Sequence, residues 1–205
     1  MILLLGDYSS VHYELSKALK DKGYDVLLLS DGDAYKKIKC DILLPEIKKF
    51  KNKFLNTFMI PFRFFGLFGV KNYFIVKNEI ERIENIKVVQ LINPVIIPSL
   101  GAIGNILLIR YLSKKNIFIS LCALGDDYNY VSACLNKKFK YSPMDKMYDN
   151  GFKSIAKYLY MLKYVYSPLY TMLDFYARKK VNIIIPGLLD YWIAHKSEKK
   201  IRDVI

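Results

Sequence analysis

Continuous apolar runs alternate with amphipathic segments along this chain. The first run, Ile2 to Leu5, contains no polar residue, which is typical of a parallel strand buried on both faces. In the next segment, Val11 to Lys22, leucine and alanine recur at helical spacing, and Gly23 then ends the predicted helix. A second apolar run extends from Asp25 to Ser30. The order of strand, helix and strand predicts one βαβ unit at the start of the chain.

The same alternation continues along the rest of the chain. Further strands are predicted at four apolar runs: Cys40 to Leu44, Lys87 to Ile92, Ile117 to Cys122 and Asn182 to Ile185. Helices are predicted from 47 to 86, from a cap at Ser99 to about Lys115, as two helices parted near Ser167 and Pro168 between Asn150 and Lys180, and after Gly187. Strands that alternate with helices specify an α/β protein. We therefore expect a Rossmann-like, doubly wound and mainly parallel sheet with helices on both faces.

Length and composition favour one folded domain. The chain has 205 residues, enough for one such domain and too few for two side by side. Its hydrophobic content of 53% excludes a disordered chain. Residues 1 to 205 are expected to form a single Rossmann-like domain.

The net charge of +13 raises the question of a nucleic-acid partner. Of the 32 basic residues, however, only five are arginine, the residue best suited to bidentate recognition of phosphates and bases. We therefore expect no nucleic-acid partner. Attraction to anionic lipid or to a polyanionic glycan fits the lysine surplus at least as well.

The metal-binding residue types are few and scattered. Cys40, Cys122 and Cys134 have no CxxC spacing, and His12 and His195 lie far apart in sequence. Neither a disulfide framework nor a zinc site is indicated, and we expect no metal. A reduced compartment, the cytoplasm, is the expected location.

Membrane-crossing segments are not predicted either. The N-terminus has none of the regions of a secretory signal. The uncharged stretch from Val88 to Ile109 reaches the about 20 residues that a membrane helix needs, but prolines, glycines and asparagines interrupt it. We interpret it as a buried strand, a loop and a helix.

The turn Gly6 to Ser10 lies where a nucleotide-binding loop would lie. It has a single glycine and a bulky Tyr8, unlike a GxGxxG loop, so NAD-type binding is disfavoured. A strand-to-helix turn still presents backbone N–H groups, with Ser9 and Ser10 as cap candidates, and could hold a phosphate or a sugar hydroxyl. A helix cap without a ligand explains the turn equally well. Asp31 and Asp33 mimic a ribose-binding acid, but a solvated turn is the better interpretation.

Asp126 and Asp127 follow another predicted strand, beside Tyr128 and Tyr130. Carboxylates and aromatic faces together suit a sugar, and one carboxylate could act as a base toward an acceptor hydroxyl. Alternatively, the sequence Gly-Asp-Asp is a turn that only caps the next helix. His12, one turn past Gly6, could face the same cleft, although a lone helix histidine is more often at the surface or partly packed.

His195 lies in a polar terminal helix and is expected to be solvated.

The stretch from Lys48 to Lys71 is rich in phenylalanine and in basic residues. The basic aromatic stretch suits a membrane surface or the surface that meets a lipid-linked acceptor. The residues predicted to form that surface are Phe58, Phe62, Arg63 and Phe65. A core-facing helix with a lysine-rich polar side is the alternative, and both interpretations stay open.

Several blocks of the sequence occur together in an order that resembles a known family. These blocks are the opening ILLLGDYSSVHYELSKALKDKGYDVLLLSDGDAYKKIKCDI, then VVQLINP at Val88 to Pro94, CALGDDYNYV at Cys122 to Val131, and IIIPGLLDYW at Ile183 to Trp192. They resemble the N-terminal domain of bacterial GT-B glycosyltransferases of the capsule and lipopolysaccharide assembly type. The resemblance covers essentially the whole chain.

The resemblance implies sugar transfer from a nucleotide-diphosphate donor to a glycan or lipid-linked acceptor, without a metal. It implies donor or acceptor contacts at Gly6, Asp7, Tyr8, Ser9, Ser10, Asn93, Gly125 and Tyr128. The catalytic candidates are Asp126, Asp127 and His12. In such enzymes a C-terminal domain holds most of the nucleotide, and this chain ends at Ile205, about where the connection to it would begin.

We therefore expect a C-terminal GT-B domain or a partner chain to complete the site, and no significant transferase activity from the 205 residues alone. The expected location is the cytoplasm, peripheral at the inner face of the cytoplasmic membrane. The alternative function is a non-catalytic, membrane-associated subunit that recruits a catalytic partner.

Overall fold

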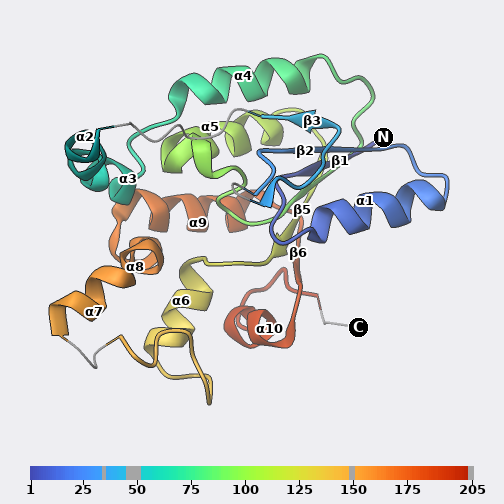
Figure 1. The fold of residues 1–205 in the computed structure, drawn as a ribbon. Helices are drawn as coiled ribbons and strands as arrows, with labels where there is room; N and C mark the ends of the chain where they lie inside the picture. The colour runs from blue at the N-terminus through green and yellow to red at the C-terminus, as the bar shows by residue number, and fades with distance from the viewer. Residues whose placement is uncertain (34–35, 45–51, 148–150, 203–205) are drawn as a thin grey trace.

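The computed structural model describes residues 1–33, 36–44, 52–147 and 151–202. Its sheet is six-stranded and parallel, with the order β3-β2-β1-β4-β5-β6 (Figure 1). The strands are β1 (Ile2–Leu5), β2 (Val26–Ser30), β3 (Ile42–Leu43), β4 (Val88–Leu91), β5 (Phe118–Ala123) and β6 (Ile183–Pro186). This is the usual strand order of a Rossmann sheet, so the predicted fold class is confirmed. The order reverses between β1 and β4, whose carboxyl ends are the expected place for a ligand.

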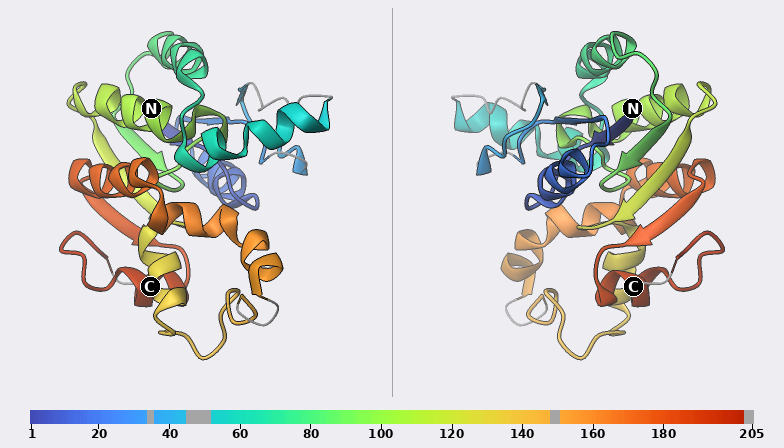
Figure 2. Two further views of the ribbon diagram at one scale, coloured as in Figure 1. Left: turned by 90° about the vertical axis from the view of Figure 1, so that its left-hand side faces the viewer. Right: turned by 90° about the vertical axis from the view of Figure 1, so that its right-hand side faces the viewer.

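Helices cover both faces of the sheet, as Figures 1 and 2 show. They are α1 (Val11–Asp21), α2 (Lys53–Phe58), α3 (Ile60–Phe65), α4 (Val70–Glu81), α5 (Gly101–Ser113), α6 (Tyr128–Leu135), α7 (Gly151–Lys157), α8 (Leu159–Tyr166), α9 (Pro168–Lys180) and α10 (Leu189–His195). Helices α4, α5 and α9 pack on one face, and α1 packs on β1 and β2 from the other.

The side chains of β1 explain the three layers. Leu3 and Leu5 belong to the large core beneath α4, α5 and α9, whereas Leu4 packs with β2 and α1 on the opposite face. Because both faces of β1 are covered, the strand needs an uninterrupted aliphatic sequence.

Some predicted helix boundaries are wrong. The segment before Ser167 forms two helices, α7 and α8, because the chain leaves the helical conformation at Tyr158, while the predicted break before Pro168 is confirmed. Ser99 does not cap α5, since a short 3-10 turn, Pro98–Leu100, precedes it. The predicted helical segment 47 to 86 contains α2, α3 and α4, and its residues 47–51 lie outside the described ranges.

Within those ranges no helix combines the length and the apolar character needed to cross a bilayer. The uncharged stretch from Val88 to Ile109 folds as β4, a loop, the 3-10 turn and most of α5, as predicted.

Four helices, α2, α3, α7 and α8, stand beyond the carboxyl ends of the strands, at the end of the molecule opposite the N-terminus (Figure 1). Helix α3 contacts α8 and α9, and α8 contacts α6. The rim of the sheet therefore faces side chains from α8.

Candidate functional site

The loops that follow β1, β4 and β5 meet at one rim of the sheet. The hydroxyl of Tyr8 donates a hydrogen bond of 2.6 Å to the carbonyl of Val95. The amide of Asn93 donates to the carbonyls of Leu124 at 2.6 Å and Asp126 at 3.3 Å. Asn93 is fully buried, so it braces the loops from behind.

The turn after β1 is filled by the protein's own groups. Gly6 has φ +75°, and a Cβ placed on it would lie 2.1 Å from the carbonyl oxygen of Ile96. Asp7 is buried, and its carboxylate accepts hydrogen bonds from the backbone of His12 at 3.2 Å and of Tyr13 at 3.0 Å. A carboxylate thus already occupies the start of α1, where a phosphate would bind.

Asp7, and neither serine, caps α1. Ser10 stands at the N-cap position with φ 66° and makes no capping bond through its side chain. The prediction that Ser9 or Ser10 caps the helix is therefore wrong, because both have left-handed backbone conformations that bring Asp7 to the helix end instead.

Asp31 and Asp33 are not simply solvated, in contrast to the prediction. Asp31 is buried, and Asp33 accepts a hydrogen bond of 2.9 Å from the backbone N–H of Ser9. Lys36 pairs with Asp33 at 2.6 Å and donates to the Ser9 hydroxyl at 3.0 Å. Two hydrogen bonds to Ser9 thus join the carboxyl ends of β1 and β2.

His12 is fully buried, so the expectation of a surface or partly packed side chain is wrong. It lies on the sheet-facing side of α1, and its Nδ1 is 2.7 Å from the carbonyl oxygen of Gly6, to which it donates. Burial lowers the pKa of His12 to about 4. The residue is a neutral part of the core beneath the turn.

The adjacent carboxylates of Asp126 and Asp127 have separate environments. Asp127 is buried; it caps α6 by accepting a 2.8 Å hydrogen bond from the N–H of Tyr130, and its other oxygen lies 2.9 Å from His195 Nε2. The expected capping by this Gly-Asp-Asp turn is confirmed for Asp127. Asp126, between the cap and Gly125, is partly exposed.

His195 is fully buried, so the prediction of a solvated side chain is wrong. Its Nδ1 lies 3.1 Å from the amide nitrogen of Asn129, which leaves Nε2–H to donate to Asp127. Burial lowers the pKa of His195, but the neighbouring Asp127 and Asp174 carboxylates outweigh burial and raise it above its usual value.

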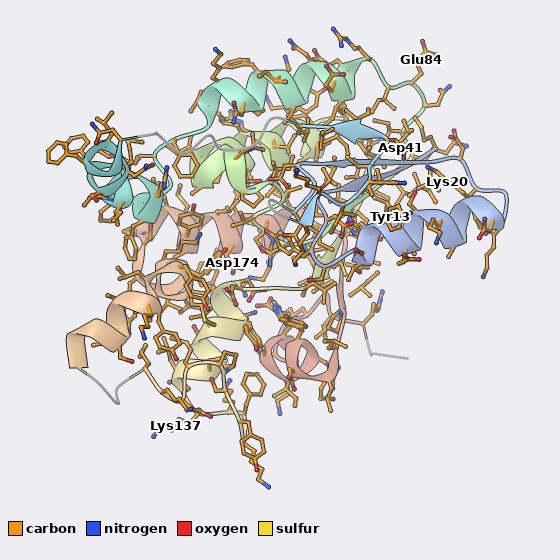
Figure 3. The ribbon with its side chains drawn as sticks, viewed as in Figure 1. Tyr13, Lys20, Asp41, Glu84, Lys137 and Asp174 are labelled. Carbon is orange, nitrogen blue, oxygen red and sulfur yellow. The ribbon has the colours of Figure 1, made fainter. Side chains whose placement is uncertain are left out.

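An ion pair on α9 continues this buried network. Asp174 Oδ2 lies 2.5 Å from Arg178 Nη2, a charge contact without the alignment of a hydrogen bond, and Arg178 also pairs with Glu198. Figure 3 shows Asp174 inside the molecule and Lys137 at its periphery. Burial raises the pKa of Asp174, and Arg178 opposes that rise. The network joins α6, α9 and α10.

Asp126 is the carboxylate that this architecture leaves unengaged. Among the described residues no group donates a hydrogen bond to its side chain. Burial raises its pKa to about 6, with a further rise from Asp127 and an opposing effect from Lys163.

Several tyrosines lie within electrostatic range of this carboxylate. Its charge adds to the raised pKa values of five of them: Tyr8, Tyr130, Tyr160, Tyr164 and Tyr191. The rings of Tyr130 and Tyr191 lie 4.9 Å apart, centroid to centroid. We call Asp126, these tyrosines and Lys163 the Asp126 site.

Sequence reasoning found only part of the Asp126 site. Tyr160, Lys163 and Tyr164 come from α8 and Tyr191 from α10, far from Asp126 in sequence. The sequence signal for Tyr160 and Tyr164 is the density of tyrosine in the segment before Pro168, which on its own does not distinguish a site from a core. Of the other predicted residues, Tyr128 packs against Phe175 at 5.2 Å, and Gly125 lies against the ring of Tyr8.

The predicted membrane or acceptor residues lie on α2 and α3. Phe58 is 60% exposed, and Phe62 and Phe65 are also exposed. Helix α3 has no buried residue, so the alternative of a core-facing helix does not hold for it. Arg63 lies on the same helix, at its contact with α8.

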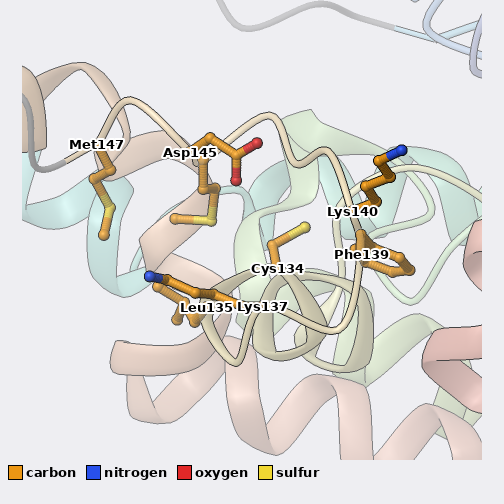
Figure 4. Close-up of a pocket in the computed structure, with 8 residues that line it drawn as sticks. Cys134, Leu135, Lys137, Phe139, Lys140, Asp145 and Met147 are labelled. Carbon is orange, nitrogen blue, oxygen red and sulfur yellow. The ribbon is translucent and has the colours of Figure 1, made fainter.

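A separate hollow of about 470 Å³ opens at the end of α6 (Figure 4). Its lining includes Cys134, Phe139, Met144, Asp145 and Met147. Burial raises the pKa of the Cys134 thiol, which keeps it protonated. In the parts of the chain that the structure describes, no three His, Cys, Asp or Glu side chains gather to hold a metal ion.

Comparisons with models of known protein families, with curated proteins and with solved structures found no match. The structure itself has a Rossmann-like fold with a parallel sheet, which is compatible with one half of a GT-B enzyme.

Proposed function

We propose that this chain forms the acceptor-side half of a glycosyltransferase, which takes part in transfer of a sugar from a nucleotide-diphosphate donor to a glycan or lipid-linked acceptor. The observation that carries the proposal is Asp126, a carboxylate without a hydrogen-bond donor among the described residues. It lies at the carboxyl end of β5, where ligands bind in open α/β sheets.

The chemistry around Asp126 suits a sugar. Tyrosine rings provide apolar faces for the C–H side of a pyranose, and phenol and carboxylate oxygens bind hydroxyl groups. Tyrosines near a carboxylate therefore favour a polyhydroxylated ligand over a purely apolar one.

Asp126 is also the best placed of the three catalytic candidates. Asp127 and His12 are buried inside the protein, whereas Asp126 is partly exposed. Its pKa of about 6 makes it a stronger base than an ordinary carboxylate while leaving it mostly ionised at pH 7.

In an inverting reaction, Asp126 would accept the proton of the acceptor hydroxyl as that oxygen bonds to the anomeric carbon. The bond from the anomeric carbon to the donor phosphate breaks, and its electron pair leaves with the nucleotide diphosphate. In a retaining reaction the same carboxylate would only orient the acceptor.

The donor nucleotide is assigned to a second domain or a partner chain. The turn at Gly6 to Ser10 gives little support for a phosphate, because Asp7 occupies the start of α1 and the Ile96 carbonyl lies against Gly6. Alone, the 205-residue chain is expected to show no steady turnover of nucleotide sugars.

The test is saccharide binding, measured by saturation-transfer NMR with a panel of oligosaccharides. Asp126→Asn is expected to weaken binding about tenfold or more, since hydrogen bonds to charged groups contribute about 1.5–3 kcal/mol. Asp21→Asn, the same change at an exposed site on α1, is the matched control. Equal binding by both variants, or binding elsewhere, would refute the proposal.

A second candidate, a membrane-associated subunit that recruits a catalytic partner, is favoured by the exposed phenylalanines. Residues 47–78 contain seven basic residues and no acidic one. Phe54 and Phe58 are 76% and 60% exposed, a costly arrangement in water unless a partner covers them.

Co-sedimentation with vesicles that contain phosphatidylglycerol tests this candidate. Phe54→Ser/Phe58→Ser is expected to abolish vesicle binding, and Leu188→Ser/Leu189→Ser, at comparably exposed apolar positions near α10, to leave it unchanged. Vesicle binding that persists without Phe54 and Phe58 excludes them as the membrane contact.

A further inference from the structure

A cavity of about 260 Å³ lies between α3 and α8 and shares Tyr160 and Lys163 with the Asp126 site. It is lined by Ile60, Arg63, Phe64, Leu159, Tyr160 and Lys163. Two of these side chains are cationic, the other four are apolar or aromatic, and none is acidic. The lining therefore combines positive charge with an apolar wall.

Lys163 is held in place without a close negative partner. Its Nζ lies 4.9 Å from the ring centroids of both Tyr164 and Tyr170. Within the described ranges no carboxylate lies within ion-pair distance of it, and Asp126 acts on it only through longer-range attraction. Burial lowers the pKa of Lys163, so its positive charge is incompletely compensated by solvent.

Arg63 reaches the same cavity from α3. The hydrogen bond that the structure gives its guanidinium, from Nη2 to the Asn56 side-chain oxygen, is long at 3.5 Å. A guanidinium has five N–H donors, so Arg63 retains donors for an anion. Two cations from different helices thus face one small volume.

The cavity also opens among apolar side chains that are exposed to solvent. Ile60 and Leu159, on opposite walls, are 49% and 39% exposed, and the phenylalanines of α2 and α3 lie on the adjoining helix surface. A ligand whose anionic group binds between Arg63 and Lys163 could therefore pack an attached alkyl chain on this exposed apolar surface.

We infer that the cavity between α3 and α8 binds the phosphate of an amphipathic ligand, with Arg63 and Lys163 as its charge partners and the exposed apolar residues along its alkyl chain. We identify this phosphate with the one that joins an acceptor to its lipid, and that identification rests on the proposed function. The Asp126 site, which includes Lys163, would then receive the sugar end of the same molecule.

The test is isothermal titration calorimetry of the full chain with n-octyl phosphate as monomer, with inorganic phosphate and with 1-octanol. We expect n-octyl phosphate to bind, and the other two to bind at least tenfold more weakly. Arg63→Gln and Lys163→Gln are each expected to weaken binding of n-octyl phosphate about tenfold, by loss of one charge-assisted contact. Lys199→Gln, an equal loss of charge at an exposed site, is the control.

Arg63→Lys and Lys163→Arg keep the charge and should recover most of the binding, which separates a binding role from a folding defect. Equal affinity for inorganic phosphate would overturn the amphipathic ligand, and equal affinity for 1-octanol would overturn the anion site. Unchanged binding by both glutamine variants would overturn the inference as a whole.

The variant Asp126→Asn distinguishes this inference from the proposed function. It should retain binding of n-octyl phosphate, since a negative charge near Lys163 is removed, while it loses saccharide binding. If saccharide binding alone fails, the anion site is still supported. If binding of n-octyl phosphate alone fails, the Asp126 site is still supported.

Discussion

The carboxyl ends of β1 and β5 carry the same parts in the same order. Each has a glycine at positive φ, Gly6 or Gly125, and then an aspartate that caps the following helix, Asp7 or Asp127. In the loop after β5, another aspartate, Asp126, stands between the glycine and the capping aspartate. At β1 the carboxylate is therefore used by the fold, whereas at β5 a second carboxylate, Asp126, has no hydrogen-bond donor among the described residues. The proposed ligand site therefore lies where a polar group has no structural task.

The largest expected effect comes from Gly6, and it should differ from that of Gly125. Gly6→Ala should lower the free energy of unfolding by about 4 kcal/mol or more, a loss confined to severe steric or buried-group defects, because its Cβ would lie 2.1 Å from a backbone oxygen. Gly125→Ala should lose about 1–2 kcal/mol, mainly from the left-handed backbone, because its nearest neighbour is the ring of Tyr8 at 3.0 Å. Urea unfolding measures both.

Gly23→Ala supplies the control for backbone strain alone. Gly23 has φ +81° and no heavy atom within 4 Å of an added Cβ. If Gly6→Ala costs no more than Gly23→Ala, the close packing of the two loops at β1 is disproved.

The two capping aspartates should also differ. Asp7→Ala is expected to lower the free energy of unfolding by about 1–2 kcal/mol, the usual cost of a lost cap. Asp127→Ala should cost about 3–5 kcal/mol, because it also leaves a buried partner without its counter-charge, namely His195.

A double-mutant cycle with His195→Ala checks the cause of that difference. If the pair explains the excess, the combined variant loses clearly less stability than the two single losses added together. Strict additivity would show that Asp127 acts through the cap alone.

Most of the fold could be predicted from the sequence because it depends on local patterns. The aliphatic run of β1, the left-handed Gly23 after α1 and Pro168 at the start of α9 each act within a few residues. The boundary at Tyr158 could not be predicted, since no glycine or proline marks it. The strand order needed only the alternation of elements and the usual topology of parallel sheets.

The candidate site was harder to predict because it depends on distant pairings. The sequence predicts Asp126 and Asp127 together at a strand end. It does not show that Asp127 pairs with His195, which lies 68 residues later in the chain. His195 looked solvated because its neighbours in sequence are polar, although Asp127 and Asn129 bury it. Lys163 reaches the site only because α8 packs on α6.

The smallest expected effect distinguishes Asp126 from Asp7 by its sign. The pKa of Asp126 is raised from 3.8 to about 6, so between these values the folded protein binds more protons than the unfolded chain, and the contribution of Asp126 to stability falls as pH rises. Asp126→Asn removes this dependence. The variant should be about 1 kcal/mol more stable than the parent at pH 7 and equal to the parent near pH 4. The difference at pH 7 is smaller than full burial would give, because Asp126 is partly exposed.

Asp7→Asn makes the same chemical change at β1, where burial also raises the pKa of the aspartate. It should nevertheless be less stable than the parent at pH 7, because both carboxylate oxygens of Asp7 accept hydrogen bonds from backbone N–H groups of α1 and an amide keeps only one oxygen acceptor. Urea unfolding at both pH values, with Asp21→Asn as the exposed reference, measures the differences. A constant difference between Asp126→Asn and the parent from pH 4 to pH 7 would mean that Asp126 is not the spare, partly buried carboxylate that separates the end of β5 from that of β1.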